Sequence, residues 1–363
     1  MMNRIKIGIT AGDVNGVGYE IILKAFEDAG MLELCTPVLY GSPKVAAYHR
    51  KAMELTTNFS IVDSAETAQP ERLNLVNCND DEVKVEFGTV SEEAGKAAFQ
   101  ALERAVEEYR KGFIDAIVTA PVCKSAIRSD KFQFPGHTEY FEHELGEGAK
   151  ALMILMNKFM RVALVTVHEP IDRVASLLGK DMIKERISTL DNSLKRDFCI
   201  EIPRIAVLAL NPHAGENGLL GREENEIIQP AVKEMSEEGV KCFGPFSADG
   251  FFGSGDYSHF DAVLVMYHDQ GLIPLKLLSM DEGVNYTAGL PLVRTSPDHG
   301  TAFDIAGKGV ASPESFRQAV YSAIDIVRCR RNEEAIHRNP LRKLYFDRRD
   351  DSDTLKLDAS DEA

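Results

Sequence analysis

The sequence has a deficit of positive charge, no long apolar run and no paired cysteine motif. It contains 41 Lys and Arg against 57 Asp and Glu, which gives a formal net charge of −16. An acidic chain of this kind is repelled by nucleic acid and by anionic membranes, so neither is expected as a partner. No apolar stretch approaches the ~18 residues of a membrane span, and the N-terminal residues contain no signal-peptide core. We therefore expect a cytoplasmic protein. If its ligand is anionic, basic residues must cluster at the binding site to offset the negative charge of the whole chain.

The six cysteines are irregularly spaced, and none forms a Cys-x-x-Cys pair. This spacing predicts reduced and mostly buried thiols rather than a metal or redox motif. The chain has 363 residues, which is more than one hydrophobic core usually organises, and 44% of them are apolar. We therefore expect two domains.

Strand-like and helical patterns alternate along the chain. Apolar runs predict strands at residues 5–10, 36–40 and 114–119, and helical patterns cover 19–28, 43–53, 92–111, 171–179, 181–197, 223–238 and 313–330. Ser91 is the predicted N-cap of the helix at 92–111. The alternation predicts an α/β fold with a largely parallel sheet. Residues 347–363 are charged and lack a core-forming pattern, so we predict a disordered acidic tail.

Three histidines each follow a short, uncharged apolar run that is typical of a strand buried on both faces. These are His168, His213 and His268, and their runs begin at Val162, Val207 and Ala262. Ligands of open α/β sheets bind beyond the carboxyl ends of the strands, so the repetition places three imidazoles at one functional edge. Three neutral imidazoles with an open fourth position suit a catalytic divalent metal ion. The alternative is that each histidine only caps its strand by hydrogen bonding to a nearby loop.

The first predicted turn, residues 10–20, is rich in glycine but lacks the Gly-x-Gly-x-x-Gly spacing of a dinucleotide fingerprint. Such a turn can admit an anion, or it can be a tight turn only. Asp13 within it can contact a metal, a ribose or a turn amide. Lys124 follows the strand at 114–119, and we expect it at the same edge as the histidines. There it can bind a phosphate or carboxylate or donate a proton, unless it is a solvated surface lysine.

Two later segments also carry hydrogen-bonding side chains. His137 and Thr138 follow a Pro-Gly turn, and they either hold a substrate anion or start a helix with Thr138 as its N-cap. Residues 211–224 form a long loop that bears glycines and is anchored by His213. Long loops at the carboxyl edge of a sheet are usually functional or disordered, and the histidine favours function.

The last part of the chain adds local positive charge to this edge. Lys276 and Arg294 supply cations, and an arginine can grip a phosphate through two hydrogen bonds. Asn285 adds a neutral donor. Asp249 and Asp269 lie in the same edge segments, where they can orient the imidazoles or accept a proton.

Several motifs resemble known families. The segment 299–309 resembles the adenosine-binding loop of the isocitrate and isopropylmalate dehydrogenases, which bind NAD(P) without a Gly-x-Gly-x-x-Gly turn. Six ordered motifs resemble the PdxA family of pyridoxal phosphate biosynthesis. They lie at residues 12–18, 119–124, 136–139, 211–216, 266–272 and 294–301. Val14 and Tyr19 depart from the family pattern, which usually has proline at both positions.

The resemblance implies an isocitrate/isopropylmalate dehydrogenase-like fold, with two α/β domains and the active site in the cleft between them. We predict that residues 1–125 and 280–340 form a discontinuous cofactor-side domain. Residues 126–279 are predicted to form the domain that binds the metal and mediates dimerisation.

The site residues of the family carry over onto matching positions. His168, His213 and His268 would hold one divalent ion (Zn, Mg or Co), with one ligand contributed across a homodimer interface. The positions that match substrate binding are His137, Thr138, Lys276, Asn285 and Arg294. Those that match the cofactor loop are His299, Gly300, Thr301, Ala302, Asp304 and Gly307. The catalytic candidates are Lys124, Asp249 and Asp269, and Lys124 or Asp249 is expected to handle the proton.

The reaction implied by the resemblance is oxidation of the secondary alcohol of 4-phosphohydroxy-L-threonine by NAD or NADP. Decarboxylation to 3-amino-2-oxopropyl phosphate would follow. A bound metal ion would lower the pKa of the substrate hydroxyl. Close relatives act on phosphorylated threonate or erythronate, which leaves the amino group of the substrate open. A zinc hydrolase with three histidine ligands is a rival from another class, but it would leave the segment 299–309 unused.

Overall fold

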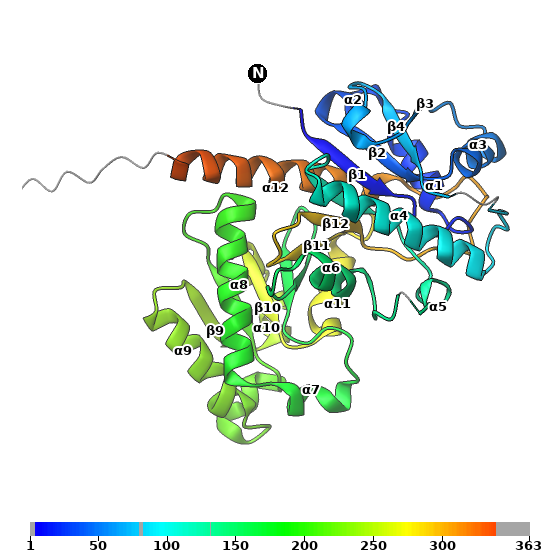
Figure 1. Cartoon of the computed structure of the whole chain (residues 1–363). Coiled ribbons are helices and arrows are strands. Elements are labelled where there is room, and N and C mark those ends of the chain that lie inside the picture. The colour runs from blue at the N-terminus through cyan, green and yellow to red at the C-terminus, as the bar shows by residue number, and fades with distance from the viewer. Residues whose placement is uncertain (1–3, 80–82, 131, 339–363) are drawn as a thin grey trace, which may run out of the picture.

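The fold is built on one sheet of twelve strands among the described residues. The structure is a computed structural model, and it describes residues 4–79, 83–130 and 132–338. The predicted tail at 347–363 lies outside the described residues. The strand order is β3-β4-β2-β1-β5-β12-β11-β6-β7-β10-β8-β9. Figure 1 shows the blue N-terminal part and the green middle part as two lobes, with β11 and β12 between them. The predicted α/β class is confirmed.

Two blocks of parallel strands flank an antiparallel centre. The first block consists of β3 (Phe59–Val62), β4 (Leu73–Asn77), β2 (Thr36–Gly41), β1 (Lys6–Thr10) and β5 (Ala116–Thr119). The second consists of β7 (Arg161–Leu164), β10 (Ala262–Val265), β8 (Ile205–Leu208) and β9 (Cys242–Phe246). Between them lie β12 (Arg294–Pro297), β11 (Val284–Ala288) and β6 (Leu152–Met156). The pairs β12–β11, β11–β6 and β6–β7 are antiparallel, so the sheet is largely but not wholly parallel.

Helices connect the strands and cover the sheet. They are α1 (Gly18–Ala25), α2 (Ala29–Leu34), α3 (Pro43–Ala52), α4 (Glu92–Arg110), α5 (Lys124–Ile127), α6 (His137–Leu145), α7 (Ile171–Leu177), α8 (Lys180–Phe198), α9 (Gln229–Glu237), α10 (Ala248–Gly253), α11 (His268–Leu278) and α12 (Glu314–Arg338). Short helical turns are η1 (Ala65–Thr67), η2 (Pro212–Gly218), η3 (Glu224–Ile228) and η4 (Asp256–His259). Ser91 caps α4 as predicted, because its hydroxyl accepts a hydrogen bond from the Ala94 amide at 3.2 Å. The last helix extends to Arg338, well beyond the predicted end at 330.

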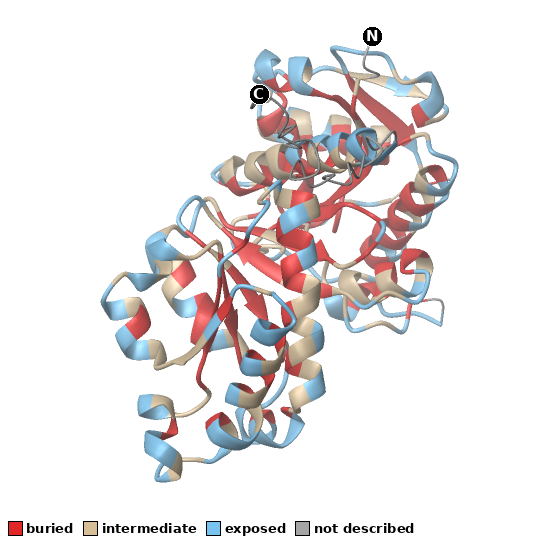
Figure 2. Ribbon diagram, turned by 90° about the vertical axis from the view of Figure 1, so that its left-hand side faces the viewer, coloured by how far each residue is buried: buried red, intermediate tan, exposed pale blue. Residues whose placement is uncertain are grey.

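The core follows the strands. Every residue of β5, β8 and β10 is buried, as expected for parallel strands that are covered on both faces. Figure 2 shows this burial as a red band through the strands, with exposed positions on the outer sides of the helices. Across the described ranges, every helix is too short or too polar to span a bilayer.

Cys199 and Cys329 form a disulfide, which corrects the prediction that all six thiols are reduced. The bond joins the end of α8 to α12 across 130 residues of sequence, with the two Cα atoms 5.7 Å apart. Only the packing of these two helices brings the sulfur atoms together, so cysteine spacing carried no signal of it. The other four cysteines, Cys35, Cys78, Cys123 and Cys242, are free thiols.

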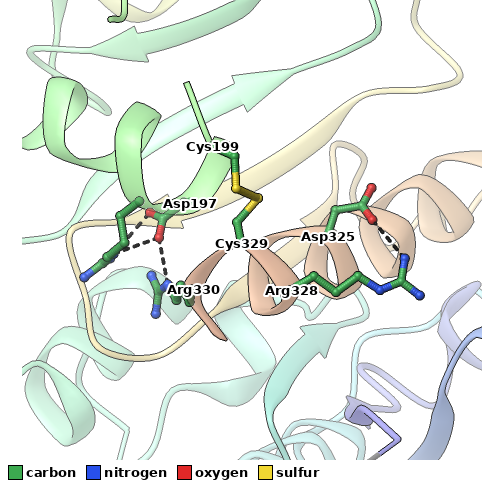
Figure 3. Close-up of a disulfide and its surroundings, with 7 residues drawn as sticks. Asp197, Cys199, Asp325, Arg328, Cys329 and Arg330 are labelled. Carbon is green, nitrogen blue, oxygen red and sulfur yellow. Dashed lines mark hydrogen bonds and ion pairs between the residues drawn. A yellow bond between two sulfur atoms is a disulfide. The ribbon is translucent and has the colours of Figure 1, made fainter. Parts of the chain in front are cut away.

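A buried carboxylate lies beside the disulfide (Figure 3). Asp197 pairs with Arg330 at 2.7 Å and with Arg196 at 2.9 Å, and it accepts a hydrogen bond from the Tyr286 hydroxyl at 2.6 Å. Burial alone would raise the pKa of Asp197, but these partners, Arg330 above all, hold it below its ordinary value. The cluster therefore ties α8, β11 and α12 together at the centre of the sheet.

A buried histidine supports the first turn. The ring of His49 packs against Tyr19 with centroids 5.0 Å apart, and its Nε2 donates to the Val14 carbonyl at 2.8 Å. Burial lowers the pKa of His49 to about 4, although the Val14 hydrogen bond opposes this shift. His49 is therefore neutral in the folded protein at pH values where an unfolded chain would protonate it.

This difference predicts that acid destabilises the protein partly through His49. The unfolded state binds a proton near pH 6.5 and the folded state only near pH 4. The free energy of unfolding should therefore fall between these values, with His49 contributing up to ~1.4 kcal/mol per pH unit. His49→Gln should flatten the dependence measured by urea denaturation, whereas His259→Gln, at an exposed histidine, should not. Equal slopes for wild type and His49→Gln would contradict this assignment.

Candidate functional site

A cavity of about 390 Å³ opens at the centre of the sheet, where β5, β6, β11 and β12 meet α11. Its size suits a small molecule. It brings together ten of the residues predicted from sequence. They are Lys124, His137, Thr138, His168, His268, Lys276, Asn285, Arg294, His299 and Gly300.

Arg294 on β12 is the most buried charge in this cavity. It is only 3% exposed, and no carboxylate pairs with it among the described residues. Its Nη2 donates to the Thr119 hydroxyl at 2.7 Å and its Nη1 to the Thr287 hydroxyl at 3.2 Å, while Nε has no partner. Burial lowers the pKa of Arg294 to about 10, which still leaves it charged at neutral pH. The cavity therefore holds a buried cation without an ion-pair partner in the described part of the chain, although the charge of Glu139 acts on it from beyond contact distance.

His137 extends the donor set of Arg294. Its Nδ1 lies 3.2 Å from Arg294 Nη2, and a guanidinium can only donate, so Nδ1 must be the acceptor. The imidazole proton is thereby assigned to Nε2, which is buried and has no partner. Burial, followed by the charges of Arg294 and Lys124, holds the pKa of His137 well below its usual value. A neutral ring with a free N–H therefore lies next to the arginine. Because α6 begins at His137 with Gly136 as its N-cap, Thr138 is not the cap.

The remaining charges leave the cavity net positive. Lys276 pairs with Asp298 at 3.3 Å, and burial raises the pKa of Asp298 although Lys276 opposes this. Lys124 and Glu139 also line the walls, and the buried Asn285 Oδ1 has no hydrogen-bond partner. Three cations, counting Arg294, thus face two carboxylates, although the whole chain carries a net charge of −16. This local excess favours an anionic ligand.

Two of the three predicted metal ligands face the same cavity. The rings of His168, after β7, and His268, at the start of α11, have centroids 5.9 Å apart. His268 Nδ1 lies 2.8 Å from Asp269 Oδ1, so Asp269 orients the ring and leaves Nε2 available. Burial, followed by Lys124 and His268, lowers the pKa of His168, which keeps that ring neutral as a metal ligand requires. Both rings therefore have the chemistry of metal ligands.

The third predicted ligand lies elsewhere. His213 is in η2, where its backbone φ is 52°, and it does not line the cavity of its own chain. Asp249 on α10 is exposed, accepts a hydrogen bond from the Ser247 hydroxyl at 2.6 Å, and does not line the cavity either. Over the ranges that the structure describes, no group of three or more His, Cys, Asp or Glu side chains could hold a metal ion. One chain therefore supplies only part of the predicted ligand set.

The predicted cofactor positions belong to the segment between β12 and α12, which we call the cofactor loop (residues 299–311). His299 and Gly300 line the cavity, whereas Thr301, Ala302, Asp304 and Gly307 do not. The Val17 amide donates to the Thr301 carbonyl at 3.1 Å. Gly307 has φ of 76°, and a Cβ there would lie 2.6 Å from the Phe87 ring, so only glycine fits. The loop therefore leads from the cavity to the first turn.

Other lining residues were not predicted as site residues. Thr119, Glu139 and Asp298 are polar, and Met153, Leu155 and Leu272 form the apolar part of the wall. Thr119 ends the predicted strand at 114–119, so its position in the chain is a usable signal. Met153 and Leu155 alternate along β6, a strand that sequence patterns did not reveal.

The position of Lys124 depends on the close contact between α4 and α5. A Cβ at Gly95 would lie 1.9 Å from the Ala126 carbonyl oxygen. Gly95→Ala should therefore push α5 away and lower the free energy of unfolding by about 1–3 kcal/mol. Gly253→Ala is the matched control, because no atom lies within 4 Å of that position. Urea denaturation of both variants tests this, and an unchanged Gly95→Ala protein would contradict it.

Comparisons with known proteins identify the family. The family model described as "Pyridoxal phosphate biosynthetic protein PdxA" matches residues 33–323. The 4-hydroxythreonine-4-phosphate dehydrogenase of Bacteroides thetaiotaomicron is 64% identical over 360 residues, which cover 99% of each chain. A putative D-threonate 4-phosphate dehydrogenase of Oceanobacillus iheyensis is 38% identical over 88% of this chain and 97% of its own.

The fold is also shared with solved structures. The crystal structure of 4-hydroxythreonine-4-phosphate dehydrogenase from Klebsiella pneumoniae has a TM-score of 0.79 and 37% identity. The match covers 90% of this chain and 98% of that one. The sequence motifs, the fold and these relatives agree, and the chain belongs to the PdxA family.

Proposed function

We propose that this protein is a 4-hydroxythreonine-4-phosphate dehydrogenase of pyridoxal phosphate biosynthesis. It would use NAD or NADP and one divalent metal ion to oxidise 4-phosphohydroxy-L-threonine, with decarboxylation to 3-amino-2-oxopropyl phosphate. The observation that carries the proposal is the unpaired guanidinium of Arg294 inside a cavity of small-molecule size. Relatives that carry this name, one of them 64% identical, support the choice of substrate.

The chain's own residues would bind and orient the anionic substrate. Arg294 and the free Nε2–H of His137 offer neighbouring donors to a phosphate or carboxylate oxygen. Lys276 lies on α11, held by Asp298, and adds a second cation. Asn285 Oδ1 is a buried acceptor without a partner, which suits a hydroxyl or ammonium group of the substrate.

His168 and His268 would hold the metal ion, together with His213 of the partner subunit. A divalent ion there supplies a Lewis acid that acidifies the substrate hydroxyl and polarises the ketone. Two imidazole rings with centroids 5.9 Å apart in one cavity support this assignment, and Asp269 fixes the orientation of the His268 ring. The position of His213 outside the cavity of its own chain agrees with a site shared by two subunits.

The cofactor loop would hold the dinucleotide, which supplies the electron acceptor. Its first residues, His299 and Gly300, lie in the cavity wall, so a cofactor on the loop would reach the substrate. Of the two candidates for the proton, Lys124 lines the cavity and Asp249 does not. We therefore propose that Lys124 Nζ takes up the proton in the cavity of its own chain, whereas Asp249, like His213, would reach a site only across the subunit interface.

A second candidate function is dehydrogenation of phosphorylated threonate. The 38% identical relative from Oceanobacillus iheyensis is named a putative D-threonate 4-phosphate dehydrogenase. Its proposed substrate would keep the phosphate, the alcohol and the carboxylate but replace the amine by a hydroxyl. The same cavity chemistry serves both molecules.

Turnover tests this choice directly. The appearance of reduced nicotinamide would be followed with 4-phosphohydroxy-L-threonine, 4-phosphothreonate and 4-phosphoerythronate, with NAD or NADP, and with Zn²⁺ or Mg²⁺. We expect reduction with the amino substrate and its loss on adding a chelator. Turnover only with the hydroxy acids would select the second candidate. If no nicotinamide is reduced with any of the three substrates, the dehydrogenase proposal is contradicted and the zinc hydrolase becomes the favoured function.

Sharing of the metal site between subunits predicts complementation. His168→Ala and His213→Ala homodimers should both be inactive, but a mixed dimer has one site with all three histidines. Random mixing makes half of the dimers mixed, so activity should return to about a quarter of wild type. A mixture of His168→Ala and His268→Ala is the control, because neither of its sites can be complete. If both mixtures lack dehydrogenase activity, the proposal of a shared metal site is contradicted.

A further inference from the structure

We propose that Glu20 and Lys24 of α1 are positioning residues that hold the cofactor loop in shape for the dinucleotide. This inference rests on the proposed function, because it assumes that residues 299–311 bind NAD(P). Neither residue lines the cavity. Their action would be exerted through the loop backbone, which passes beside α1 (Figure 1).

Lys24 binds the end of the loop directly. Its Nζ donates to the Gly309 carbonyl at 2.9 Å and to the Ala311 carbonyl at 2.8 Å. Its third contact is Glu20 Oε1 at 2.8 Å. An ammonium group has three donors, so every N–H of Lys24 is used, two of them on the loop.

Glu20 also binds the end of the loop, and we call Glu20 and Lys24 together the clamp. Its Oε1 also accepts a hydrogen bond from the Ala311 amide at 2.8 Å. The side chain of Glu20 is 1% exposed and that of Lys24 is 18% exposed. A buried ion pair repays its desolvation better when its other donors and acceptors find partners. Here the loop backbone provides partners for Lys24 Nζ and for Glu20 Oε1, whereas the buried Glu20 Oε2 has none among the described residues. The pair and the loop end therefore depend on each other.

The start of the loop is held by the N-terminal end of the same helix. The Val17 amide, which precedes α1, bonds the Thr301 carbonyl, and a Cβ at Gly16 would lie 2.8 Å from that oxygen. Inside the loop the backbone bonds join Ile305 to Ala302 and Lys308 to Ile305. These short turns do not fix the ends. One helix thus sets the distance between the two ends of the loop.

A loop ordered before binding loses less conformational freedom when the ligand arrives. Lys24→Met should therefore weaken the affinity for NAD or NADP by about ten-fold or more, with the KM for the cofactor rising likewise. The KM for the phosphorylated substrate and kcat should change little, because Arg294 and the two cavity histidines are untouched. A general loss of stability would instead move all of these parameters together.

The test compares Lys24→Met, Glu20→Gln and Lys24→Arg with Lys51→Met, a control at an exposed lysine on α3. Hydrogen exchange of residues 299–311 is measured on the protein without cofactor, and NAD and NADP affinities are measured by calorimetry. We expect faster exchange at Ala311 and weaker cofactor binding for Lys24→Met and Glu20→Gln. Lys24→Arg should restore part of the affinity, because a guanidinium can also donate to two carbonyls. Lys51→Met should match wild type.

The outcomes separate this inference from the proposed function. If the wild-type protein binds neither NAD nor NADP, the proposed function fails, although the exchange data still report the clamp. If wild type binds a cofactor and both clamp variants match it in affinity, the inference is overturned, whether or not their exchange changes. Should Lys24→Met fail to fold, the nearly isosteric Glu20→Gln decides.

Discussion

A guanidinium buried without a carboxylate partner is the constraint on which the site depends. Transferring a charge out of water is unfavourable unless other groups stabilise it, and Arg294 has only two threonine hydroxyls and one imidazole nitrogen. This arrangement leaves a place for an anion. The phosphate of a ligand would pair with the guanidinium. The unfavourable free energy of burying this charge would then be offset on binding, which would increase the affinity for the ligand. The low exposure of Arg294 makes that interaction stronger than it would be at the surface.

The mixed sheet explains how Arg294 is held. Its strand, β12, runs parallel to β5 and antiparallel to β11, so it lies where the two pairing patterns meet. Thr287 on β11 is the direct register partner of Arg294, and Thr119 ends β5 on the other side. Each neighbouring strand thus gives one hydroxyl to the guanidinium.

Sequence patterns located the edge of the sheet that carries the site. The apolar runs before His168 and His268 became β7 and β10, and both rings reached the cavity, because parallel strands end at a common edge. The cap at Ser91 was equally predictable, since it depends only on residues three positions away. The Pro-Gly turn and the local positive charge had already marked His137 and Arg294 as candidates, and the motif resemblance gave both the role of substrate binding.

Features set by long-range packing were not predictable. The disulfide between Cys199 and Cys329 depends on how α8 meets α12. The pairing of β6 with β11 likewise joins two strands that lie far apart in the chain. His213 also follows an apolar run, but the left-handed backbone of η2 carries it away from its own cavity. The contact between Lys24 and the cofactor loop joins residues 285 positions apart. From the sequence, the i,i+4 pair of Glu20 and Lys24 looks like an ordinary helix ion pair, and nothing in it predicts the contact with the loop.

The most direct measurement is calorimetric binding of inorganic phosphate to wild type and to Arg294→Met, with urea denaturation of both proteins without ligand. The account predicts that the variant loses phosphate affinity by a factor of about a hundred, as expected for a charge-assisted contact in a buried site. Its free energy of unfolding should stay within about 1 kcal/mol of wild type, because an uncompensated charge has been removed along with its hydrogen bonds. Phosphate binding that is equally strong in both proteins would contradict the central role of Arg294.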